Sequence, residues 1–442
     1  MNKTIIFGLP RIGLSIVLGI EVYSIFALYT IGYQLAPFLV GFTLCIGYIC
    51  TAIFSFFFGW ISDIKYTRWG RRKPYLFIFS PILCTSFIFL MMPSLVITDL
   101  NNQALLFFWL LFWEIIFRIS YSAMTPYQAW LAEQFEVKDR PKVSQIQSVF
   151  NLLATLILWI FNFLVLTQVF EQLETEPNFI PIDYSIPVFI FVLITIIVVY
   201  IVVFFMPTEP HYKINSNMLS ILKTSLKNRN FMIISFVLGF SSIAWSMLIP
   251  QVLPFIEVVL NFSQLENLIN LIIIFACIII FLEIWRRLIA KVGKKKSLIY
   301  VFVLTIAFLP FTLLILIPMN SYFIISVILM SAIGAGLAGY FLIPAVVYAD
   351  IAQDDQKITG ELKAGTYTGF PLIILNLFQA IGVLFLGFIN ELPIINVRSS
   401  TYSIGLILWG PICALILLVS LIFIIKFIKI DYDWEQQKVM MK

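Results

Sequence analysis

Three ionisable residues lie inside segments that are otherwise apolar. Glu21 lies near the middle of the first apolar segment, and Glu114 and Arg118 lie in the fourth. Because Glu114 and Arg118 are four residues apart, a helix places them on one face, where they can form an ion pair. Charge inside hydrocarbon is costly, so each of these residues is a candidate for solute binding or proton coupling. The alternative is a buried salt bridge that only holds helices together.

Other polar and aromatic residues extend this candidate site. Tyr121 and Gln128 continue the Glu114–Arg118 face of the fourth segment, within about 80° of each other at 100° per residue. A polar stripe along a membrane helix must face protein or water. Aromatic rings stack on sugars, and polar side chains of later segments can contact the same solute. These further candidates are Trp245, Tyr340, Asn376 and Gln379.

The sequence lacks the residues that most enzymes and metal sites need. It has a single histidine, His211, which argues against a histidine-based metal site or a catalytic triad. All five cysteines lie in apolar segments, with no CxxC pair and no sign of a disulfide framework. No Walker motif is present, which argues against an ATP-driven pump. We expect no metal, no cofactor and no enzymatic activity.

The elements that carry these residues must be membrane-spanning helices. The chain has 442 residues, of which 61% are hydrophobic and 12% charged, against about 25% charged in a soluble protein. Apolar runs of about 20 residues must be helical in a bilayer. We predict an all-α integral membrane protein with twelve spans, at residues 11–33, 36–60, 75–94, 104–132, 146–168, 186–206, 231–258, 267–290, 297–318, 322–350, 366–389 and 403–428.

The basic residues predict the orientation of these spans. If both termini face the cytoplasm, all of the 28 basic residues except Arg118 and Arg398 lie on or near the cytoplasmic side. This asymmetry is the positive-inside pattern of a membrane protein. It accounts for the net charge of +5 without a nucleic-acid partner. The expected location is the cell membrane, with lipids as partners.

The two halves of the chain resemble each other weakly. The basic turn 70–73 follows the second predicted span, and a similar turn, 293–296, follows the eighth span, 223 residues later. Such a repeat predicts two six-helix bundles. The predicted bundles are residues 1–206 and 231–428, joined by a cytoplasmic connector, 207–230, and followed by a tail, 429–442. Within the connector, 216–227 has the pattern of an amphipathic helix.

Two loops carry a resemblance to a known family. The segment from Gly59 through Asp63 to Pro74 resembles the loop signature of the major facilitator superfamily. Its Arg-x-Gly-Arg-Arg-Lys-Pro ending is similar to that of the glycoside–pentoside–hexuronide cation symporters, which include melibiose permease. The segment 348–367 resembles the same family's loop after the tenth span. The resemblance implies a cytoplasmic gate at Asp63, Arg68, Arg71, Arg72 and Asp350.

The same comparison bears on the coupling ion. Thr51, Ser55 and Met124 stand where the resembled family has cation-binding aspartates. A buried carboxylate takes up a proton readily because burial disfavours its charged form. Glu21 and Glu114 therefore favour proton coupling over sodium coupling.

We expect a secondary transporter that moves a small solute, a sugar or glycoside, by alternating access. A lysolipid or other amphiphile carrier of the same fold is one alternative. A membrane sensor that transports nothing is an alternative of a different class.

Overall fold

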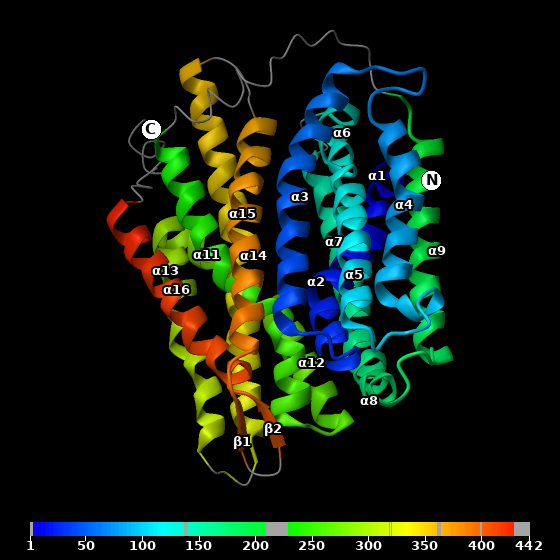
Figure 1. Cartoon of the computed structure of the whole chain (residues 1–442). Helices are drawn as coiled ribbons and strands as arrows, with labels where there is room; N and C mark the ends of the chain where they lie inside the picture. Colours follow the sequence, from blue (N-terminus) through cyan, green and yellow to red (C-terminus); the bar gives the residue numbers. More distant parts are fainter. Residues whose placement is uncertain are drawn as a thin grey trace.

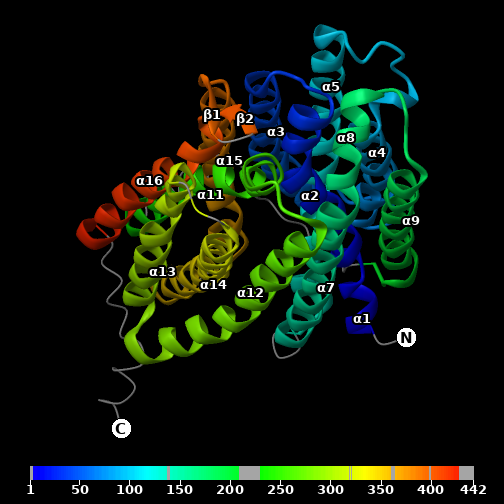
Figure 2. The same cartoon turned by 90° about the horizontal axis from the view of Figure 1, so that it is seen from below.

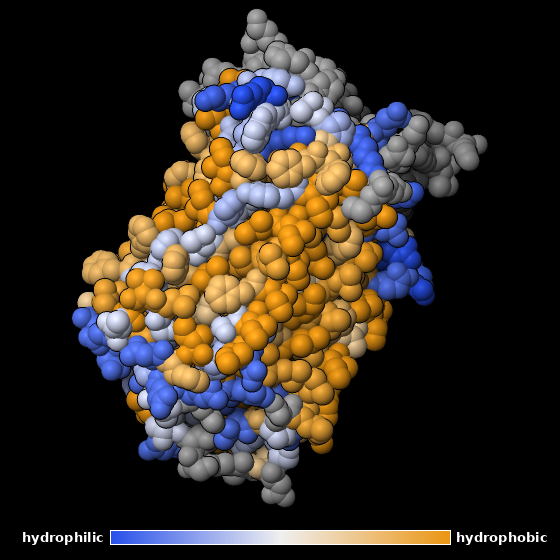
Figure 3. All heavy atoms as spheres, turned by 90° about the vertical axis from the view of Figure 1, so that its right-hand side faces the viewer, coloured by the Kyte–Doolittle hydropathy of each residue, from blue (hydrophilic) through white to orange (hydrophobic). Residues whose placement is uncertain are grey.

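The computed structural model of the chain describes residues 3–136, 140–208, 229–317, 319, 321–359, 364–397 and 400–427. Within this described part, twelve helical segments are long and apolar enough to cross a membrane, which confirms the predicted all-α architecture. They run roughly parallel to one another (Figure 1). Figure 3 shows a broad apolar band across one flank, with polar residues gathered toward both ends, as expected of a surface that contacts lipid.

The first half of the chain forms one side of the bundle (Figure 1). Its elements are α1 (Lys3–Gly8), α2 (Pro10–Ala27), η1 (Leu28–Gly32), α3 (Pro37–Ile64), α4 (Lys73–Met91), η2 (Pro93–Leu95), α5 (Gln103–Ser122), α6 (Thr125–Gln134), α7 (Arg140–Phe161), η3 (Asn162–Leu166), α8 (Thr167–Thr175) and α9 (Ile182–Phe205).

The second half forms the other side. Its elements are α11 (Arg229–Pro254), η4 (Phe255–Leu260), α12 (Gln264–Val292), α13 (Lys294–Phe308), η5 (Leu309–Leu316), α14 (Phe323–Thr359), α15 (Ala364–Asn390), β1 (Ile394–Val397), β2 (Ser400–Ser403) and α16 (Gly405–Phe427).

The backbone repeats between the halves at two places. The first span ends in the π-helical segment η1 followed by Gln34 at φ 53°, and the seventh ends in η4 followed by Asn261 at φ 46°. Gly70 and Gly293 lie in the two basic turns at φ 95° and 84°. A positive φ at this value suits glycine, which has no Cβ. A glycine at positive φ therefore follows both the second and the eighth span.

The two halves meet closely where α3 begins and α15 ends. A Cβ on Gly41 would lie 2.6 Å from the Val383 carbonyl oxygen, so the backbones of α3 and α15 touch. Nearby, the rings of Phe38 and Phe388 have centroids 4.5 Å apart. The Phe38 amide at the start of α3 donates a hydrogen bond to the Glu391 carboxylate. We call this contact between Phe38, Gly41 and residues 383–391 the inter-half contact.

Several boundaries differ from the sequence-based expectation. The first span begins at Lys3, and the fourth is broken between α5 and α6 at residues 123–124. A short antiparallel hairpin, β1–β2, lies before the last span and was not predicted, because its strands have only four residues each. The predicted amphipathic segment 216–227 and the tail 429–442 lie outside the described residues.

The charge pattern predicts which ends of the spans face the cytoplasm. In a variant without its native cysteines, Asn178→Cys should react with an impermeant maleimide on intact cells, because residue 178 is exposed in the loop after α8. Ser216→Cys should react only after permeabilisation. The reverse pattern would contradict a cytoplasmic N-terminus.

Candidate functional site

The three ionisable residues singled out in the sequence lie together. The Arg118 guanidinium pairs through Nη2 with Glu21 Oε1 at 2.6 Å and through Nε with Glu114 Oε1 at 2.7 Å. Glu21 comes from α2, whereas Glu114 and Arg118 come from adjacent turns of α5. Both carboxylates are fully buried and the arginine is 2% exposed. We call these three residues the charged trio.

A third helix, α3, covers the charged trio. A Cβ on Gly47 would overlap Glu114 Oε1, so only glycine leaves room for this carboxylate. The next residue, Tyr48, lies beneath the arginine, with the guanidinium carbon 4.3 Å from its ring centroid. This is a cation–π contact in a desolvated place, where such contacts are strongest.

The charges of the trio do not balance when both acids are ionised. Two carboxylates share one guanidinium, and Glu21 Oε2 and Glu114 Oε2 receive no hydrogen bond from the described part of the chain. A buried net negative charge is costly, and two like charges in one dry site disfavour each other. One proton on either of the two free carboxylate oxygens would balance the charge of the trio.

The other predicted residues of the fourth span are separated by the break in the helix. Tyr121 is half-buried on α5, close to the trio, whereas Gln128 is exposed on α6. The predicted stripe assumed one continuous helix. Because α5 ends at Ser122, the structure places Tyr121 with the trio and Gln128 apart from it.

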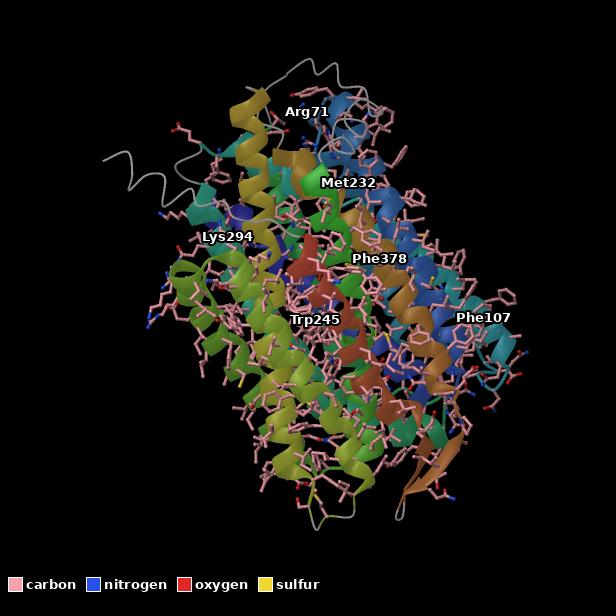
Figure 4. The ribbon with its side chains drawn as sticks, turned by 90° about the vertical axis from the view of Figure 1, so that its left-hand side faces the viewer. Arg71, Phe107, Met232, Trp245, Lys294 and Phe378 are labelled. Carbon is pink, nitrogen blue, oxygen red and sulfur yellow. The ribbon has the colours of Figure 1, made fainter. Side chains whose placement is uncertain are left out.

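The predicted residues of the second half form a separate group. The rings of Trp245 on α11 and Tyr340 on α14 stack, with centroids 4.8 Å apart and planes at 24°. Both are buried, and Figure 4 places Trp245 deep within the second half. On α15, the Asn376 amide donates to its own helix, and the Gln379 carbonyl accepts from Ser246. The structure does not bring these residues to the trio.

The predicted gate contains a partner that the sequence analysis missed. Arg71 and Arg72 are buried and both contact Glu133 Oε1 of α6, at 3.0 and 2.5 Å. Arg72 also donates to Ser62. The sequence did offer a signal for this residue, because Glu133 is the acidic residue at the end of the predicted fourth span.

The remaining gate residues stand apart from this cluster. Arg68 is exposed beside the ring of Trp69. The side chains of Asp63 and Asp350 lie outside the described part of the structure. For Gly47 and Tyr48 no sequence signal existed, because both lie in an uncharged apolar run.

The fit of α3 against the trio predicts different effects of two alanine substitutions on the same helix. Gly47→Ala should lower the stability of the purified protein by about 1–3 kcal/mol, as overpacking does. Gly59→Ala is the control, because its Cβ meets nothing within 4 Å and alanine favours a helix. Thermal unfolding in detergent measures both, and equal midpoints would contradict the close packing at Gly47.

The described chain resembles solved transporter structures. A nucleoside transporter, NupG, superposes with a TM-score of 0.66 at 14% identity, covering 96% of this chain and 99% of that one. A D-xylose–proton symporter gives 0.64 at 15% identity, covering 96% and 95%. FucP, a major facilitator superfamily transporter in the outward conformation, gives 0.57 at 14%, covering 96% and 97%. At these identities the likeness shows the fold.

Sequence comparison assigns the family. No curated protein matches the chain. The profile of the MFS/sugar transport protein family matches residues 6–431, nearly the whole length. The match confirms the major facilitator membership indicated by the loop after the second span. The chain is an integral membrane protein of the MFS/sugar transport protein family.

Proposed function

We propose that this protein is a secondary transporter that takes up a sugar or glycoside together with a proton. The observation that carries the proposal is the charged trio, in which two buried carboxylates share Arg118. The family supports a sugar-like solute. The expected site of action is the cell membrane, with both termini in the cytoplasm.

The trio favours a proton over a sodium ion. A sodium ion needs several oxygen ligands at once, as hard cations do. Here the permanent charge of Arg118 occupies one oxygen of each carboxylate and repels a second cation. A proton needs only one free oxygen, such as Glu21 Oε2 or Glu114 Oε2. Binding of this proton removes the excess negative charge. The positive charges of the proton and Arg118 then balance the negative charges of the two carboxylates, and the site is neutral.

A change in the trio can reach the other half through α3. This helix contacts the trio at Gly47 and Tyr48, and it contacts α15 at Gly41 in the inter-half contact. Gly41 lies six residues before Gly47, which is about 9 Å along a helix. A movement of α3 caused by protonation would therefore alter the inter-half contact, as alternating access requires.

The trio predicts proton-driven accumulation in proteoliposomes. At a stoichiometry of one proton per solute, an inward gradient of one pH unit supports about tenfold accumulation, since 1.4 kcal/mol corresponds to a factor of ten. Glu21→Gln should equilibrate the solute without accumulating it, because the glutamine cannot release a proton. The measurement is the uptake of radiolabelled sugars and glycosides, taken from a panel, by the wild type and by Glu21→Gln.

The matched control is the same experiment with a sodium gradient and no pH gradient, for which we expect no accumulation. Sodium-driven uptake that persists in Glu21→Gln would show that coupling lies elsewhere.

A thermal-shift screen tests the class of solute. It uses the same panel with lysolipids added, and stabilisation by lysolipids alone would favour the amphiphile carrier over the sugar transporter.

The Arg71–Arg72–Glu133 cluster predicts a cytoplasmic gate. Arg71→Ala and Glu133→Gln should slow solute exchange without abolishing solute binding, because they loosen ion pairs far from the trio. Lys65→Ala is the control, since this side chain is exposed in the same loop and is not one of the predicted gate residues. Counterflow rates and thermal shifts separate exchange from binding. Wild-type exchange rates in both variants would rule out this role.

A further inference from the structure

The end of α12 carries two arginines on its surface. The side chains of Arg286 and Arg287 are 70% and 72% exposed. They lie six and five residues before the end of the helix at Val292, ahead of the basic turn 293–296. In the first half, by contrast, the arginines lie in the basic turn itself, where Arg71 and Arg72 are buried against Glu133.

One carboxylate is shared by the two exposed arginines. Glu283 accepts from Arg286 Nε and from Arg287 Nε, each at 2.7 Å. Glu283 is the only acid in the segment 283–296. The same segment holds six basic residues, namely Arg286, Arg287, Lys291, Lys294, Lys295 and Lys296. The excess positive charge on this surface calls for an anionic partner.

The surface also has an apolar part on the same face of α12. Ile272 and Ile279 precede Arg286 in steps of seven residues, and Ile280 precedes Arg287 by seven. A step of seven returns to nearly the same helix face. These isoleucines are 55%, 46% and 54% exposed. An apolar ridge therefore runs along α12 toward the arginine pair.

The position of α12 places this surface against lipid. In Figure 2, α12 and α13 meet at the edge of the bundle, and in Figure 4 Lys294 marks this turn on the outer flank. Arg286 lies six residues before the end of α12, about 9 Å along the axis. With α12 crossing the bilayer, we expect the guanidinium groups beside the lipid headgroups and the isoleucine ridge beside the acyl chains.

We propose that this face of α12 is a docking surface for an anionic phospholipid. Arg286 already donates to Glu283 through Nε and Nη2, and Arg287 does so through Nε. The phosphate therefore binds at the outer Nη1–Nη2 ends of the two guanidinium groups, whose planar geometry matches two phosphate oxygens. The acyl chain lies along Ile272, Ile279 and Ile280. A soluble phosphate compound would use only the charged part of this surface, so the apolar ridge identifies the partner as a lipid. This inference does not depend on the transported solute.

The test is a lipid titration of the purified full-length protein by native mass spectrometry, with phosphatidylglycerol as the probe. Arg286→Gln combined with Arg287→Gln should bind phosphatidylglycerol about 25-fold more weakly, since each basic residue near an anionic headgroup contributes about a factor of five. Arg68→Gln, which removes an exposed arginine just before the basic turn 70–73, should bind like the wild type.

Equal affinity in the double variant would overturn the proposal, as would an equal loss in Arg68→Gln. Competition by glycerophosphoglycerol as strong as that by the intact lipid would also overturn it, because that compound lacks acyl chains. If the double glutamine variant fails to fold, the double lysine variant keeps both charges but loses the guanidinium groups. A weaker affinity is expected for it, and wild-type affinity would contradict guanidinium recognition.

Discussion

Arg118 is a permanent positive charge enclosed by apolar helices, and the first half of the protein is arranged to neutralise it. A guanidinium cannot lose its proton to escape burial, so it needs acids within contact distance. One of these acids, Glu114, is a turn away on the same helix. The other, Glu21, must come from a different span, so α2 and α5 are held side by side by this pairing. The extra carboxylate leaves the trio with an excess negative charge, and the proposed proton coupling rests on this excess.

Helix α3 connects this electrostatic centre to the other half of the molecule. At Gly47 and Tyr48 it closes over the charged trio, and at Gly41 its backbone touches α15. Both contacts depend on glycine, because any larger side chain would push the helices apart. A helix that is fitted to a charged cluster on one face and to the other half at one end links the two regions directly. This packing gives the proposed coupling a physical route.

The two halves share a backbone pattern but not a set of interactions. Gly70 and Gly293 both have a positive φ, and η1 and η4 end the first and seventh spans. The charged trio nevertheless occurs in the first half, whereas the corresponding region of the second half holds the stacked Trp245–Tyr340 pair. The first half therefore buries charge at this place, whereas the second half buries an aromatic pair.

Much of this organisation could be predicted from the sequence, because membrane burial imposes simple rules. Backbone groups in hydrocarbon must be satisfied within helices, which makes twelve apolar runs twelve spans. The cost of intramembrane charge singled out Glu21, Glu114 and Arg118, and the spacing of four residues predicted the pair on α5. The basic turns at 70–73 and 293–296 indicated the repeat and the family.

Only the tertiary structure decided which residues meet across helices. That Glu21 is the second partner of Arg118 depends on how α2 packs on α5. The roles of Gly47 and Tyr48 depend on the contact face of α3, and an uncharged apolar run does not reveal that face. Glu133 joins Arg71 and Arg72 because α6, which follows the break at residues 123–124, packs against α3. Sequence spacing determines neighbours along one helix, whereas neighbours between helices follow from packing.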